Sequence, residues 1–148
     1  MIETITDNSW LLTAALFMPL VGVLALLFVP RDDERLIKQI GIVASGLTFA
    51  FALAVLIAFD FDQADKLQFF ADAQWIEFLR SNYTIGVDGL SLPLFVLSAF
   101  ITFVTLIYTW EHMPEAGQPK SFIGLILILQ VGMAGTFVAQ DLVLFFVF

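Results

Sequence analysis

The sequence of 148 residues has no cysteine and a single histidine, His112. Without cysteine it can form no disulfide, thiolate zinc site or cysteine-ligated iron–sulfur cluster, and one histidine argues against paired haem ligation. It also has neither a glycine-rich dinucleotide-binding turn nor a phosphate-binding P-loop, so NADH and ATP are not expected to bind here. We therefore expect no catalytic residue, no cofactor-binding residue and no metal site in this chain.

Charged residues are scarce, at 14% of the sequence, whereas 60% of the residues are hydrophobic. A soluble domain has about 25% charged residues, so these proportions indicate a membrane protein. The net charge is -8, from 14 acidic and 6 basic side chains. This balance excludes a nucleic-acid partner, because phosphate neutralisation needs a basic surface.

Four stretches contain no Asp, Glu, Lys or Arg, at residues 10–29, 40–59, 90–110 and 122–138. About 20 helical residues cross the hydrocarbon core of a bilayer, and none of the stretches shows the strict alternation of a strand. A fifth helix is expected to start at about residue 142. We predict an all-α, polytopic transmembrane helix bundle with four complete helices and the start of a fifth. Since a span cannot stop after so few residues, we interpret the sequence as a fragment of a longer chain.

The distribution of basic residues predicts how the bundle is oriented. The acidic leader argues against a signal peptide, whereas three basic residues follow the first span within residues 31–38. Positive charge keeps a loop on the cytoplasmic side. The predicted cytoplasmic loops carry 4 Lys and Arg residues and the predicted external loops carry 2. We therefore expect a multi-pass protein of the plasma membrane, with its N-terminus and the 60–89 loop extracytoplasmic.

The long 60–89 loop is predicted to contain short extended or re-entrant pieces, at residues 75–79 and 83–85. Asp88 and Ser91 are expected to cap the entrance of the third long helix, and Asp141 is expected to cap the fifth. Within the first span, Pro19 is expected to kink the helix.

Gln130 is the most polar side chain within any span. We expect it to form an interhelical hydrogen bond, with contact to a buried file of water as the alternative. The hydroxyls of Thr102, Thr105 and Thr136 are expected to bond to preceding carbonyls. No complete span has an ionisable residue, so proton carriage is not expected in this part of the chain. The candidate polar positions are Gln130, Asp141 and Asp88.

Small residues predict close approach between helices, and aromatic residues at the ends of spans predict anchors at the membrane interface. The small residues are Gly41, Ser45, Gly46, Gly132, Gly135 and Thr136, and the aromatic ones are Trp10, Tyr108 and Trp110.

Three motifs carry a family resemblance. Residues 86–92 read Gly-Val-Asp-Gly-Leu-Ser-Leu, residues 108–111 read Tyr-Thr-Trp-Glu, and residues 140–148 read Gln-Asp-Leu-Val-Leu-Phe-Phe-Val-Phe. In these motifs, and in hydropathy along its whole length, the chain resembles the antiporter-like subunits of respiratory complex I. The resemblance is strongest to the M chain, the bacterial equivalent of mitochondrial subunit 4. His112 and Met113 do not match the family's pattern.

The resemblance implies the N-terminal part of an inverted-repeat, antiporter-like fold of about fourteen helices, in which the first repeat begins at the fourth helix. In that family an essential glutamate follows the motif at residues 140–148 and acts with lysines of later helices in a proton path. The resemblance thus implies a proton-translocating subunit of NADH:quinone oxidoreductase, which couples quinone reduction to proton pumping. It also implies that NADH, flavin, iron–sulfur clusters and quinone are bound by partner subunits, beside further membrane subunits.

Two alternatives stay open at this point. The D-type subunit of a multisubunit sodium/proton antiporter shares much of the motif pattern, and membrane hydrogenases and photosynthetic complexes use related chains with other electron donors. A purely structural role is the other alternative, in which these helices shield a channel and bind lipid or neighbouring subunits.

Overall fold

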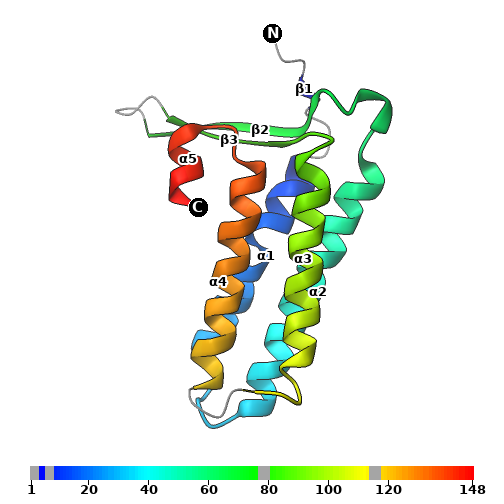
Figure 1. Cartoon of the computed structure of the whole chain (residues 1–148). Helices are drawn as coiled ribbons and strands as arrows, with labels where there is room; N and C mark the ends of the chain where they lie inside the picture. Colours follow the sequence, from blue (N-terminus) through cyan, green and yellow to red (C-terminus); the bar gives the residue numbers. More distant parts are fainter. Residues whose placement is uncertain (1–3, 6–8, 77–80, 114–117) are drawn as a thin grey trace.

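The computed structural model describes residues 4–5, 9–76, 81–113 and 118–148, and four long helices form its body (Figure 1). The helices are α1 (Ser9–Phe28), α2 (Glu34–Ala58), α3 (Ser91–Tyr108) and α4 (Pro119–Val138), followed by the short α5 (Leu142–Val147). All four long helices have the length and hydropathy needed to cross a membrane. The predicted polytopic helix bundle is confirmed.

The bounds of α2 differ from the charge-free stretch that predicted it. The helix begins at Glu34 rather than at residue 40, because the Asp33 carboxylate accepts a hydrogen bond of 3.1 Å from the backbone nitrogen of Leu36. The charged first turn therefore belongs to the helix. Pro19 lies buried inside α1, which is one helix from Ser9 to Phe28.

The outer faces of the bundle carry large apolar side chains. Leu27 is 65% exposed, Leu97 50% and Leu129 59%. Soluble monomers rarely expose apolar surface on this scale, whereas lipid tails match it. The chain is therefore a multi-pass membrane protein.

Small residues let the helices approach closely inside the bundle. A Cβ atom added to Gly41 would lie 2.6 Å from Cγ2 of Ile123 in α4, and one added to Gly46 would lie 3.1 Å from Cε2 of Phe103 in α3. The predicted close approach is confirmed at both positions. Among the glycines that meet another long helix, the closest approach is at Gly22, which the sequence did not single out: an added Cβ would lie 2.4 Å from Cβ of Ala44.

A three-stranded sheet lies across one end of the bundle, at the top of Figure 1. Its strands are β1 (Thr4–Ile5), β2 (Leu67–Ile76) and β3 (Ser81–Val87), in the order β1-β2-β3. β1 pairs parallel with β2, and β2 pairs antiparallel with β3 in a register that places Ala71 opposite Ile85. The pieces predicted at 75–79 and 83–85 are thus extended rather than re-entrant, although residues 77–79 lie outside the described residues.

A buried glutamine organises the segment between α2 and the sheet. The side chain of Gln68 is 2% exposed, and its Nε2 donates to the carbonyls of Asp60 (2.7 Å) and Gln63 (3.2 Å). Its Oε1 accepts from the backbone nitrogen of Asp60 at 2.8 Å. One side chain therefore closes the turn around the 3-10 helix η1 (Phe61–Gln63).

The entrance to α3 is capped reciprocally. Oδ1 of Asp88 accepts from the backbone nitrogens of Ser91 (2.7 Å) and Leu90 (3.0 Å), while Oγ of Ser91 accepts from the backbone nitrogen of Asp88 (3.0 Å). The predicted capping role of both residues is confirmed. The hydrogen bond from the Ser91 backbone lowers the pKa of Asp88, so the cap stabilises the fold above the ordinary aspartate pKa and loses this effect as the pH falls through the lowered pKa.

Gly22 and Gly124 offer a matched test of packing inside the bundle. No atom lies within 4 Å of a Cβ added to Gly124. A Cβ added to Gly22 would instead meet the Cβ of Ala44, which cannot move away by changing its rotamer. Gly22→Ala should therefore destabilise the full-length protein by about 1–3 kcal/mol, and Gly124→Ala should be neutral or stabilise it by up to about 1 kcal/mol. Denaturant unfolding in mixed micelles measures both. Equal effects of the two substitutions would contradict the described α1–α2 contact.

Candidate functional site

Polar side chains lie buried in the interior of the bundle. Gln130 of α4 is 1% exposed and lies about 12 Å along the helix from its end at Val138 and about 16 Å from its start at Pro119, from the rise per residue. It therefore sits near the middle of the span. Within the long helices, the hydroxyls of three other buried residues bond to carbonyls of their own helices at 2.7–3.1 Å, and these residues are Ser45, Thr48 and Ser98.

A hydrogen bond joins α3 to α4 at this depth, from Oγ1 of Thr102 to Oε1 of Gln130. The predicted interhelical bond of Gln130 is confirmed. The expectation for Thr102 is wrong, because its hydroxyl reaches the amide of Gln130 instead of a preceding carbonyl. Thr105 and Thr136 do bond as predicted, to the carbonyls of Ile101 and Met133, each at 2.8 Å.

The amide nitrogen of Gln130 is buried and has no hydrogen-bond partner in the described part of the chain. A buried amide donor without a partner costs about 1–3 kcal/mol, and a buried water molecule is a common solution. Neither a hydroxyl nor an amide changes its charge near neutral pH. The Thr102–Gln130 pair can therefore hold two helices together or orient a water molecule, but it cannot store a proton.

The other two candidate residues lie apart from Gln130. Asp88 precedes α3 and Asp141 precedes α5, both at the end of the bundle that carries the sheet. Oδ1 of Asp141 accepts from the backbone nitrogen of Leu144 at 3.0 Å, so its predicted capping role is confirmed. The segment beside it joins the sheet, since the backbone nitrogen of Gln140 donates to the carbonyl of Thr84 at 2.9 Å. The three candidate residues therefore do not form one site.

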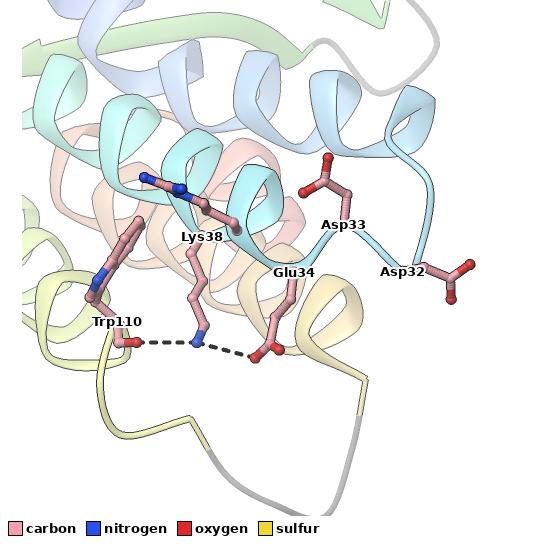
Figure 2. Close-up of a pocket in the computed structure, with 6 residues that line it drawn as sticks. Asp32, Asp33, Glu34, Lys38 and Trp110 are labelled. Carbon is pink, nitrogen blue, oxygen red and sulfur yellow. Dashed lines mark hydrogen bonds and ion pairs between the residues drawn. The ribbon is translucent and has the colours of Figure 1, made fainter.

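Charged residues gather at the opposite end of the bundle, around a pocket of about 430 Å³ that Figure 2 shows. Nζ of Lys38 donates to the backbone carbonyl of Trp110 and forms an ion pair with Oε1 of Glu34, each at 3.1 Å. The chain at Trp110 follows the end of α3, where carbonyl groups lack helical partners and the helix dipole favours a cation. Lys38 therefore links the start of α2 to the segment that follows α3.

Lys120 makes the corresponding contact between α4 and α1. Its Nζ donates to the carbonyls of Val29 (2.8 Å) and Leu27 (3.2 Å), at the end of α1. The sequence predicted these lysines only as markers of a cytoplasmic loop. Their capping role could not be predicted from the sequence, because the carbonyl partners lie 72 residues away for Lys38 and 91 residues away for Lys120.

Comparison with known proteins shows the family. The profile described as "NADH-ubiquinone oxidoreductase chain 4, amino terminus" matches residues 12–136. NADH-ubiquinone oxidoreductase chain 4 of Arabidopsis thaliana is 34% identical over 148 residues, which are 100% of this chain and 29% of that protein.

Two further relatives come from other organisms. F(420)H(2) dehydrogenase subunit M of Methanosarcina mazei is 34% identical over 133 residues, 90% of this chain and 26% of that protein. NAD(P)H-quinone oxidoreductase chain 4 1 of Nostoc sp. is 32% identical over 140 residues, 95% of this chain and 25% of that protein. The chain thus spans between a quarter and a third of the length of these relatives. By its match to the family profile over most of its length, it belongs to the family of NADH-ubiquinone oxidoreductase chain 4, in that family's amino-terminal region.

Proposed function

We propose that this chain is the amino-terminal part of a proton-translocating membrane subunit of an NADH:quinone oxidoreductase. The observation that carries the proposal is the family match over residues 12–136, together with relatives that are named quinone oxidoreductase chain 4. The subunit would work beside other membrane subunits of the complex. NADH, flavin, iron–sulfur clusters and quinone would be bound by partner subunits, and this chain would hold none of them.

The role of these helices in such a subunit would be structural. In the described residues the polar groups at mid-span are hydroxyls and one amide, and the described carboxylates lie outside the four long helices except at the first turn of α2. A proton path needs groups that titrate or ordered water between such groups. We infer that α1 to α4 support and shield the proton path, and that titrating groups on later helices carry the protons.

The orientation proposed for the chain places the lysine-bearing end of the bundle in the cytoplasm. Both Lys38 and Lys120 lie at that end, and the sheet lies at the other. With positive charge retained inside, the N-terminus and the sheet would be extracytoplasmic in the plasma membrane.

The leading alternative is the D-type subunit of a multisubunit sodium/proton antiporter, which would move protons without an electron donor. The Methanosarcina mazei relative is named an F(420)H(2) dehydrogenase subunit, whereas the other two are named for NADH or NAD(P)H. NADH as the electron donor is therefore part of the proposal. An experiment on the function must therefore vary the electron donor and the sodium gradient separately.

Inverted membrane vesicles from cells with and without the full-length protein provide that experiment. We expect NADH with a soluble quinone to drive proton uptake that is lost when the protein is removed and returns with it. Proton movement driven by a sodium gradient alone should not depend on the protein. Sodium-driven exchange that requires the protein, with unchanged NADH-driven uptake, would contradict the proposal and favour the antiporter.

Replacement of Gln130 tests whether the mid-span hydrogen bond is structural. Gln130→Leu leaves the hydroxyl of Thr102 without its partner and should cost about 1 kcal/mol of stability. Adding Thr102→Val removes the orphaned hydroxyl, so the double variant should recover part of the loss. Stability and donor-driven proton uptake are measured for both variants in the full-length protein.

The expected result is normal proton uptake per quinone reduced in every variant that assembles. Normal assembly and quinone reduction with lost proton uptake in Gln130→Leu would show instead that the amide takes part in proton transfer through water.

A further inference from the structure

A groove of about 430 Å³ runs between α1 and α4 at the lysine-bearing end of the bundle. Its walls are apolar and exposed on the surface of the described chain, since Leu27 and Leu125 are each 65% exposed and a Cβ at Gly124 would meet open space. The apolar residues that line it are Val23, Leu26, Leu27, Gly124, Leu125 and Ile128.

The mouth of the groove is polar and positively charged. It is lined by Arg31, Gln118, Lys120 and Ser121, and none of the described lining residues is acidic. The neighbouring Asp32 and Asp33 line the separate pocket of Figure 2 instead. Two positive charges therefore lie at one end of an apolar channel, and none of the described residues that line the channel is a carboxylate.

The groups at the mouth retain the capacity to bind an anion. Nζ of Lys120 has three hydrogen-bond donors and gives two of them to the carbonyls of Leu27 and Val29. Arg31 is exposed in the turn after α1. Gln118, at the start of α4, makes no side-chain cap, and the N-terminal end of a helix dipole is positive.

We propose that this groove binds an anionic phospholipid, with the headgroup phosphate between Arg31 and Lys120 and one acyl chain along α1 and α4. A phosphate alone would use the charged mouth but would leave the apolar channel unfilled. A neutral lipid would fill the channel but leave both cations without a counter-charge. An anionic phospholipid matches both parts, and basic pockets between membrane helices favour such headgroups.

Binding of dioleoyl phosphatidylglycerol to the full-length protein in neutral detergent, followed by native mass spectrometry, tests the two halves of the site separately. Arg31→Gln removes a charge at the mouth, and its matched control is Arg35→Gln, which removes an equal charge at the same end but from the pocket of Figure 2. We expect Arg31→Gln to weaken phosphatidylglycerol binding about fivefold and Arg35→Gln to leave it unchanged.

Gly124→Leu fills the groove without changing charge, and its matched control is Ala50→Leu on the exposed face of α2. We expect Gly124→Leu to lose phosphatidylglycerol binding and Ala50→Leu to keep it. On the unaltered protein, phosphatidylcholine should bind more weakly than phosphatidylglycerol. Inorganic phosphate should not displace the lipid at equal concentration.

Equal weakening by Arg31→Gln and Arg35→Gln would overturn the proposal, because it would indicate only general attraction to the basic end. Full binding in Gly124→Leu would also overturn it, because no acyl chain would then occupy the groove. Displacement of the lipid by inorganic phosphate would point to a simple anion site and would overturn it as well.

Discussion

The exclusion of charge from the hydrocarbon core is the constraint on which the rest of this structure depends. The four long helices carry no charged side chain beyond residues 34–38 of α2 and Lys120 of α4, so the charged side chains act at the two ends of the bundle. The described carboxylates that cap α-helices lie at helix starts, at Asp33, Asp88 and Asp141. Two lysines bind the carbonyls that follow helix ends. The scarcity of charge keeps the helices in the bilayer. The few charged side chains that remain bind backbone groups at the starts and ends of helices.

Between the two ends, packing replaces charge. In a membrane the hydrophobic effect does not drive helices together, because lipid tails are as apolar as the helix surfaces. Close contact between small residues and a few hydrogen bonds must therefore hold the bundle together. Gly22, Gly41 and Gly46 supply the contact, and the Thr102–Gln130 bond supplies the one described side-chain link between long helices at mid-span. None of these groups titrates near neutral pH, which fits the proposed role of α1 to α4 as a support for a proton path on later helices.

Features that depend on local sequence could be predicted. The charge-free runs predict the spans, and the Asp-Gly-Leu-Ser motif predicts the cap at Asp88 because its hydrogen bonds join residues at most three positions apart. Features that depend on which helices become neighbours could not. The partner of Thr102 lies 28 residues away in α4, and the carbonyl bound by Lys38 lies 72 residues away. The register of the sheet shifts between Gln68 and Ala71, where Phe69 has a positive φ of 54°, and hydropathy carries no signal for this shift.

The proposed orientation places the two ends of this bundle on opposite faces of a membrane, with Lys38 and Lys120 on the cytoplasmic face. The chain has no cysteine, so single cysteines can be introduced without background from this region. Asp32 and Gln74 are exposed at opposite ends of the bundle, and each can be replaced by cysteine in the full-length protein. Labelling with a membrane-impermeant maleimide should modify Gln74→Cys in cells whose plasma membrane is intact, and Asp32→Cys only after that membrane is permeabilised. Labelling of both from the same side, or in the reverse order, would contradict the account.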